Sequence, residues 1–181
     1  MKRIIIGISG ASGVGLGLKF LKALPNNLEK YCVLSKGAKK VLELEEKVEF
    51  DFREIWNLKM LDDEDLGACI ASGSFVCESM AVIPCSSDVL AKIACGISDT
   101  LLLRAASVMI KENRRLLLGV REMPFSAIML ENMLKLSKLG VVIAPPIFGY
   151  YVGSSVAEME ELLMGKWCDS LGISYEYKRW R

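Results

Sequence analysis

The sequence predicts an α/β protein, built as a doubly wound three-layer sandwich with a mostly parallel sheet. Strand-like and helix-like segments alternate along most of the 181 residues. The strand-like segments are continuous apolar runs, as expected for strands that helices cover on both faces. A glycine-rich turn directly follows the first of these runs and precedes a helix. Because no repeat or linker interrupts the pattern, we expect one domain over residues 1–181, ending in a helix and a tail.

The strands are predicted from short runs of apolar residues, many of them β-branched. These runs cover residues 2–8, 31–34, 80–83, 116–120 and 141–144. Pro84 is expected to end the third strand and Pro145 the fifth, because proline cannot donate a hydrogen bond to the sheet. Residues 48–52 are strand-like but lie in the least regular stretch, 46–78, which the sequence does not assign.

The helices are predicted from apolar residues at helical spacing, over residues 12–24, 35–45, 88–94, 99–113, 126–139 and 156–171. Ser35 and Asp99 are expected to cap the second and fourth of these helices. Pro25 is expected to end the first, and Gly140 to follow the end of the fifth. The acidic run 62–65 is interpreted as a solvated loop.

Composition limits the possible partners. The chain is 52% hydrophobic with a mean hydropathy of +0.33. A chain of this size cannot easily hide so much apolar surface alone, so we expect subunit interfaces. A net charge of +1 gives no general footprint for nucleic acid. No apolar run is long enough to span a membrane, and no secretory signal is evident.

Histidine and cysteine usage limits the chemistry. The chain has no histidine, which excludes Ser-His-Asp triads, Cys-His dyads and histidine zinc sites. Acid–base steps must therefore use carboxylates, Lys, Tyr, Cys or the substrate itself. The six cysteines form no CxxC pair, so we expect no metal site. Free, mostly buried thiols are typical of a reducing cytoplasm, where we expect this protein to lie.

The glycine-rich turn at residues 7–13 (GISGASG) is the first candidate site. Its glycines permit close backbone approach, the following helix offers free amides to an anion, and Ser9 and Ser12 add hydroxyl donors. Ser35 stands after the second strand, where a dinucleotide site needs an acidic residue. The pattern favours a mononucleotide phosphate, and a turn without a ligand is the alternative.

Two further candidate loops follow later strands. Ser86 and Ser87 come after the third strand and suit a ring or a phosphate, with capping of the next helix as the alternative. Cys85 is interpreted as a structural thiol, since no histidine is available to ionise it. Arg121 and Glu122 follow the fourth strand. They suit phosphate binding and proton transfer, with a surface ion pair as the alternative.

A set of basic and phenolic residues suits a second phosphate. Arg104 and Lys111 are seven residues apart and therefore share a helix face. Tyr151 and Lys166 are the other members of this set. Ordinary solvated side chains are the alternative interpretation.

Together these segments resemble the UbiX-type flavin prenyltransferases over nearly the whole chain. The resemblance is carried by residues 7–13 (GISGASG), 72–74 (SGS), 80–86 (MAVIPCS), 99–112 (DTLLLRAASVMIKE), 120–124 (VREMP), 131–140 (ENMLKLSKLG) and 144–146 (APP). It implies a Rossmann-like or flavodoxin-like fold, assembled as a dodecamer with active sites at subunit junctions. It also implies a metal-independent transfer of a dimethylallyl group from dimethylallyl phosphate to N5 and C6 of reduced FMN. The product, prenylated FMN, serves a partner UbiD-type decarboxylase.

The resemblance also implies roles for individual residues, by position in the matching motifs. FMN would be bound by Gly10, Ala11, Ser12, Ser35, Ser86, Ser87, Asp88, Val89 and Arg121. The prenyl phosphate would be bound by Arg104, Lys111, Tyr151 and Lys166, with Trp180 closing over the site. Glu45, Glu122 and Ser12 would be catalytic, the two glutamates by handling protons during ring closure.

The sequence departs from the family pattern at three places. Val89 replaces a usual Thr, and residues 112–115 read Glu-Asn-Arg-Arg in place of Glu-Arg-Arg-Pro. The loop 152–155 is one residue shorter and lacks the usual His and Pro, which leaves open whether the donor is a mono- or a diphosphate.

Three other functions remain as alternatives to the one that the resemblance implies. The flavin-dependent cysteine decarboxylases of the same superfamily rely on a histidine that this chain lacks. A non-catalytic FMN carrier would not need the phosphate-binding set. A direct aromatic-acid decarboxylase would turn over without a partner enzyme.

Overall fold

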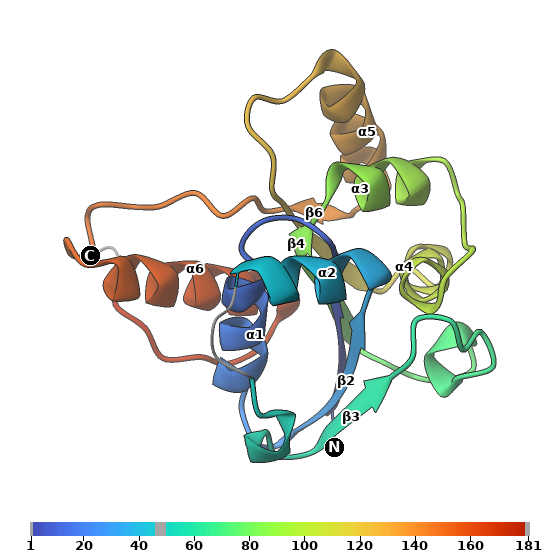
Figure 1. Ribbon diagram of the computed structural model, residues 1–181, viewed down its shortest axis with the longest axis horizontal. Helices are drawn as coiled ribbons and strands as arrows, with labels where there is room; N and C mark the ends of the chain where they lie inside the picture. Colours follow the sequence, from blue (N-terminus) through green and yellow to red (C-terminus); the bar gives the residue numbers. More distant parts are fainter. Residues whose placement is uncertain (1, 46–49, 180–181) are drawn as a thin grey trace.

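The computed structural model describes residues 2–45 and 50–179 and shows a twisted sheet between two layers of helices (Figure 1). Within these residues the strands are β1 (Lys2–Ile8), β2 (Leu28–Leu34), β3 (Leu58–Leu61), β4 (Ser79–Cys85), β5 (Arg115–Val120) and β6 (Val142–Ile143). They form one six-stranded sheet in the order β3-β2-β1-β4-β5-β6. Every neighbouring pair is parallel, which confirms the predicted fold class.

The helices divide between the two faces of the sheet. They are α1 (Val14–Ala23), α2 (Lys36–Glu45), α3 (Ser87–Ala94), α4 (Leu101–Lys111), α5 (Ala127–Lys138) and α6 (Val156–Leu171), with short 3₁₀ helices η1 (Phe52–Glu54) and η2 (Cys69–Ala71). Buried residues of α1, α2 and α6 pack on one face. Those of α3, α4 and α5 pack on the other. No helix in the described part of the chain is long and apolar enough to cross a membrane.

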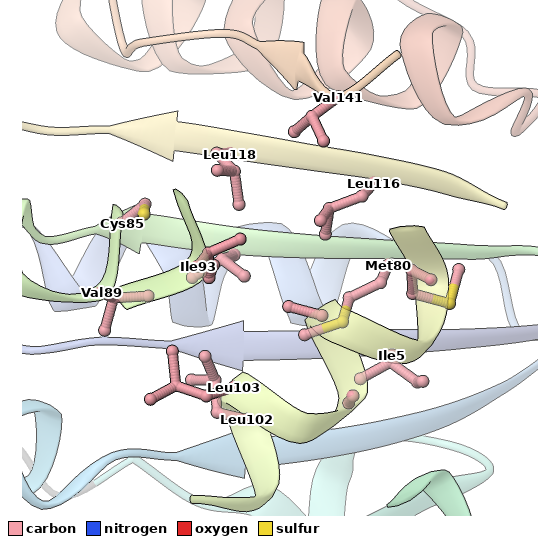
Figure 2. Packing of buried hydrophobic residues seen from close by; sticks show 14 of the residues in the cluster. Ile5, Met80, Cys85, Val89, Ile93, Leu102, Leu103, Leu116, Leu118 and Val141 are labelled. Atoms are coloured by element: carbon pink, nitrogen blue, oxygen red, sulfur yellow. The ribbon is translucent and has the colours of Figure 1, made fainter. Parts of the chain in front are cut away.

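The α3–α4–α5 face holds the larger hydrophobic cluster (Figure 2). The strands contribute Ile5, Met80 and Leu118, and the helices cover them with Ile93 and Leu102, all five nearly inaccessible to solvent. Burial of each such side chain stabilises the fold by about 1.5–3 kcal/mol before conformational entropy is counted. The cluster packs the sheet tightly against these helices and so holds the strand ends, and the loops that follow them, in place.

The strand order reverses between β1 and β4, which pair with each other in the middle of the sheet. The loop after β1 leads to α1 on one face, and the loop after β4 leads to α3 on the other face. In open parallel sheets, such a reversal leaves a crevice beyond the carboxyl ends of the strands. The candidate loops therefore meet at one place.

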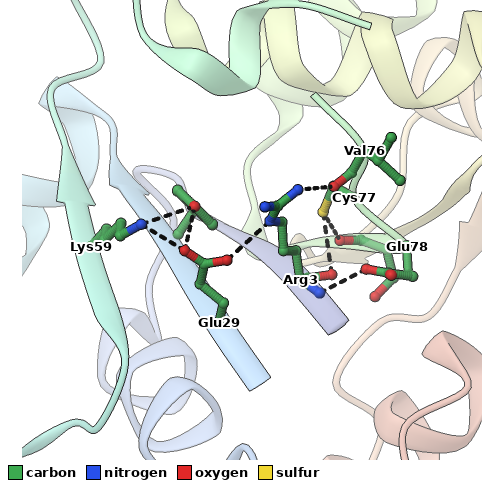
Figure 3. A network of polar contacts seen from close by, with 8 residues as sticks. Arg3, Glu29, Lys59, Val76, Cys77 and Glu78 are labelled. Carbon is green, nitrogen blue, oxygen red and sulfur yellow. Dashed lines mark hydrogen bonds and ion pairs between the residues drawn. The ribbon is translucent and has the colours of Figure 1, made fainter. Parts of the chain in front are cut away.

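At the opposite, amino edge of the sheet, Glu29 holds three neighbours together (Figure 3). Its carboxylate accepts hydrogen bonds from Lys59 Nζ at 2.6 Å, the Tyr31 hydroxyl at 2.7 Å and Arg3 Nε at 2.9 Å. Lys59, Tyr31 and Arg3 together lower the pKa of Glu29 to about 2. The network joins β1, β2 and β3 through side chains as well as through the backbone.

One strand lies in the stretch 46–78 that the sequence left unassigned, and one strand prediction was wrong. The edge strand is β3, Leu58–Leu61, and not the strand-like residues 48–52, of which 48 and 49 lie outside the described residues and Phe52 begins η1. β3 is short and only partly buried, so its sequence carries a weak apolar signal. Pro84 does not end the third strand, because β4 continues to Cys85 through a register irregularity that accommodates the missing donor.

Two predictions about the start of α4 were also wrong. The cap is Thr100, whose hydroxyl accepts from the Leu103 amide at 3.4 Å, and not Asp99. Asp63, assigned to a solvated loop, is buried, and its carboxylate accepts from the Leu102 amide at 2.8 Å. Its carbonyl also accepts from the Leu101 amide. Asp63 therefore satisfies amides of the first turn of α4 that have no partner within the helix.

Other local predictions are confirmed. Ser35 caps α2 by accepting from the Ala38 amide at 3.1 Å. Gly140 follows α5 with a positive φ of 81°, a backbone conformation that favours glycine. α6 spans the predicted residues, Val156–Leu171. The described cysteines are free thiols, and four of them, Cys32, Cys77, Cys85 and Cys168, are buried.

Candidate functional site

Ser9 joins the loop after β1 to the loop after β4. Its buried hydroxyl donates to the Pro84 carbonyl at 2.9 Å and accepts from the Ser86 amide at 2.7 Å. The Ser9 amide also donates to the Pro84 carbonyl. The prediction that the Ser9 hydroxyl donates to a phosphate was wrong, because its proton is already used inside the fold. Ser9 instead fixes the spacing of the two loops.

The backbone of Gly10 lies directly against Gly37 at the start of α2. A Cβ on Gly10 would lie 2.7 Å from the carbonyl carbon of Gly37, closer than packed atoms approach. Gly13 follows with φ 91° as the N-cap of α1, whose first turn contains no acidic residue. The amides at this helix start can therefore serve an anion. Gly37 was missed by sequence reasoning, although a glycine in the first turn of a predicted helix was a usable signal.

Glu45 reaches the same turn from the last residue of α2. Its carboxylate accepts from the Gly13 amide at 2.9 Å. The Ser12 hydroxyl, the Gly13 amide and the charge of Arg121 lower the pKa of Glu45. The structure thus brings Ser12, Glu45 and Arg121 together, and their contacts favour the ionised form of Glu45.

A cleft of about 650 Å³ opens beyond the carboxyl ends of β4 and β5. Its polar lining comes from Ser12, Arg121 and Glu122. Its remaining walls are mostly apolar and are formed by Gly13, Leu16, Ile83, Pro84, Gly119, Val120, Met123, Phe125 and residues 145–148. Such a cleft suits a flat aromatic ring with a polar edge. Ile147 and Phe148 had not been predicted, although they continue directly from the predicted APP motif.

Arg121 and Glu122 are positioned by the backbone at the end of β5. The Arg121 amide donates to the Cys85 carbonyl at 3.0 Å, which ties this loop to β4. The Glu122 carboxylate accepts from the Met123 amide at 3.1 Å and is exposed to the cleft. Both side chains are therefore available to a bound molecule.

The predicted second flavin loop is the N-terminal turn of α3. Ser86 caps this helix by accepting from the Val89 amide at 3.3 Å, and Ser87 and Asp88 are its first residues. The Val89 side chain is buried in the core cluster. Val89, at the position where the family pattern usually has Thr, therefore adds an apolar side chain to the core. Burial also raises the pKa of the Cys85 thiol, consistent with a structural thiol.

The basic residues predicted for a second phosphate are split between the two faces of the sheet. Arg104 and Lys111 lie on α4, where Arg104 Nε donates to the Ala71 carbonyl at 3.0 Å and Lys111 pairs with Glu112. Lys111 ends α4 just before β5 begins, so it lies at the amino edge, away from the cleft. Lys166 lies on α6, which packs on the opposite face, and Tyr151 lies in the segment that precedes this helix. Trp180 lies outside the described residues.

The residues at the cleft fit FMN. The start of α1 offers amides to the phosphate, and the apolar walls suit the isoalloxazine ring. Among the described residues, no group of acidic, histidine or cysteine side chains suits a metal ion.

Comparison with known proteins decides the family. The flavoprotein family profile matches residues 1–164. The flavin prenyltransferase UbiX of Campylobacter jejuni is 47% identical, over 99% of this chain and 98% of that protein. The chain belongs to the UbiX-type flavin prenyltransferase family.

Solved structures of this family share the fold closely. The crystal structure of AnUbiX in complex with FMN and dimethylallyl pyrophosphate is 36% identical, with a TM-score of 0.93, and covers 99% of this chain and 97% of that chain. The dodecameric FMN-dependent Ubix-like decarboxylase from Escherichia coli O157:H7 is 39% identical, with a TM-score of 0.91, and covers 99% of both chains.

Proposed function

We propose that this chain is a flavin prenyltransferase that transfers a dimethylallyl group to N5 and C6 of reduced FMN. The observation that carries the proposal is the meeting of Ser12, Glu45, Arg121 and Glu122 at an apolar cleft beside the start of α1. The AnUbiX structure, which contains FMN and dimethylallyl pyrophosphate, supports the same conclusion.

The chain's own residues provide binding and proton transfer. The amides at the start of α1 suit the FMN phosphate, and the cleft walls hold the ring away from water. Bound reduced FMN supplies the nucleophilic N5 and C6 positions. The donor's C–O bond breaks as phosphate leaves, so cations near that phosphate stabilise the developing charge. Glu122, Glu45 or the departing phosphate then accepts the proton lost from C6.

We further infer that a complete site needs more than one copy of the chain. Lys111 lies at the opposite edge of the sheet from Glu122, and α4 and α6 lie on opposite faces. Within one chain, Lys111 cannot join Tyr151 and Lys166 around one phosphate. The dodecameric structure from Escherichia coli supports a homo-oligomer, and we propose a dodecamer with its sites at subunit junctions.

The other parts of the proposal rest on the resemblance. We propose dimethylallyl phosphate as the donor, a UbiD-type decarboxylase as recipient of the product, and the cytoplasm as the compartment. The carrier and decarboxylase alternatives are not favoured, because the relatives with high identity are flavin prenyltransferases.

The test is an anaerobic incubation of the purified protein with reduced FMN and dimethylallyl phosphate, followed by mass spectrometry of the extracted flavin after air oxidation. We expect a mass gain that corresponds to one C5 prenyl unit. Unmodified FMN with both the monophosphate and the diphosphate donor would show that the protein is a flavin carrier and not a prenyltransferase.

A further inference from the structure

The chain after α6 turns back along that helix, so that the C-terminal end lies beside the segment leading into α6 (Figure 1). The Tyr177 ring packs directly against Gly165, where any side chain would collide with it. Lys178 Nζ donates to the Val152 carbonyl at 2.5 Å, which ties the tail to the shortened loop 152–155. The tail is thus held against both α6 and the loop after Tyr151.

Asp169 of α6 is the main polar contact of this tail. One carboxylate oxygen accepts from the Tyr177 hydroxyl at 2.6 Å and from Arg179 Nη1 at 2.7 Å. The other oxygen accepts from Arg179 Nη2 at 2.8 Å. The Arg179 guanidinium also lies over the Tyr177 ring, 4.4 Å from its centre. Both oxygens of Asp169 are therefore engaged by residues of the tail.

Lys166 lies three residues before Asp169 and so shares its face of α6. The two charges interact, because Lys166 contributes to the lowered pKa of Asp169, which is about 2. Yet no carboxylate in the described part of the chain lies within ion-pair distance of Lys166. If the tail did not engage Asp169, this carboxylate would be the nearest anion on α6 to the Lys166 ammonium. Trp167, the residue after Lys166, donates to the Ala144 carbonyl at 3.0 Å, and Ala144 directly precedes the segment that lines the cleft.

We propose that Arg179 and Tyr177 engage Asp169 and so keep the Lys166 ammonium available for the phosphate of the prenyl donor. Both are positioning residues that act through Asp169 and Lys166. The inference rests on the proposed function, since Lys166 has this role only if a donor phosphate binds there. It assigns the tail a part in donor affinity that does not depend on Trp180.

The test compares Arg179→Gln with the double variant Arg179→Gln, Asp169→Asn. Arg179→Gln leaves a carboxylate that can pair with Lys166, so we expect the donor KM to rise about two- to fivefold with FMN affinity unchanged, because both side chains are exposed. In the double variant no carboxylate remains at position 169, so the KM should return to the wild-type value. Arg53→Gln is the matched control, because Arg53 forms a similar two-oxygen pair with Asp51 on an unrelated surface.

A purely structural role for the tail gives the opposite pattern. The double variant would then be at least as impaired as Arg179→Gln, and that result would overturn the inference. An unchanged donor KM in Arg179→Gln would overturn it as well. Calorimetric titration of dimethylallyl phosphate into the FMN-loaded wild type distinguishes failure of this inference from failure of the proposed function. A wild type that neither binds nor converts the donor overturns the proposed function together with this inference.

Discussion

The Ser9 hydroxyl at the end of β1 accepts a 2.7 Å hydrogen bond from the Ser86 amide at the end of β4. The two residues are 77 positions apart in the chain. β1 and β4 are the strands between which the sheet order reverses, and each is followed by a loop of the candidate flavin site. This bond therefore determines how far apart the two halves of the site lie.

Replacing Ser9 tests this role. Ser9→Ala leaves the Ser86 amide without its partner, which costs about 1–3 kcal/mol in the free energy of unfolding. We expect FMN affinity to fall as well, because the loops lose their spacing. Urea denaturation and fluorescence titration with FMN measure the two effects. Ser137→Ala, at an exposed position of α5, is the control, and equal stability of the two variants would contradict the prediction.

Asp63 is expected to be a determinant of stability despite its position in an acidic run. Asp63→Ala removes the acceptor for the Leu102 amide and should lower the free energy of unfolding by about 1–2 kcal/mol. Glu64→Ala, next to it and exposed, should change little. Thermal or urea unfolding compares them, and a similar small effect for both would restore the solvated-loop interpretation.

The lowered pKa of Glu29 predicts that the stability of the fold depends on pH. Its folded pKa lies below the ordinary value of 4.5, at about 2. The contribution of its network is therefore present above pH 4.5 and is lost as pH falls through 2. Because Arg3 and Lys59 are partly exposed, we expect a contribution of about 1 kcal/mol. Glu29→Gln should remove that part of the stability difference between neutral and acidic pH, and the exposed Glu43→Gln should not.

Glu122 is expected to act after FMN binding. Its carboxylate is exposed to the cleft and makes one backbone hydrogen bond, so Glu122→Gln should preserve the fold and FMN affinity. We expect this variant to stop after the first bond forms, with the C6 proton of the flavin retained. Proton NMR of the extracted flavin reads this directly. Loss of FMN binding in the variant would show that Glu122 holds the cofactor.

Mixed assemblies test whether sites are shared between subunits. Lys111→Gln and Glu122→Gln should each be impaired alone, because both residues belong to the proposed site. Since Lys111 and Glu122 lie at opposite edges of the sheet, one site would draw them from different subunits. If one subunit supplies Lys111 and another Glu122, random co-assembly restores about a quarter of the sites. Co-expression of Lys111→Gln with Arg104→Gln, both on α4, is the control that should not recover. Activity no higher than that of the separate variants would overturn the inference that one site draws Lys111 and Glu122 from different subunits.

Local patterns in the sequence were sufficient for most of the secondary structure. The apolar run of β1 and the helical spacing of α6 predicted their bounds, because burial on a sheet or a helix face imposes its own period. β3 escaped prediction because an edge strand is only partly buried. The absence of histidine and the glycine turn likewise limited the chemistry without any coordinates.

The sequence by itself thus determined the α/β class, the strand-end loops and the residue types available for catalysis. Only the tertiary structure decided which distant side chains meet. It brought Glu45 to Gly13, committed Ser9 to the inside of the fold and separated Lys111 from Lys166. The physical reason is that hydrophobic periodicity is a local property of the chain. Contacts between distant residues depend instead on strand order and on which face each helix covers.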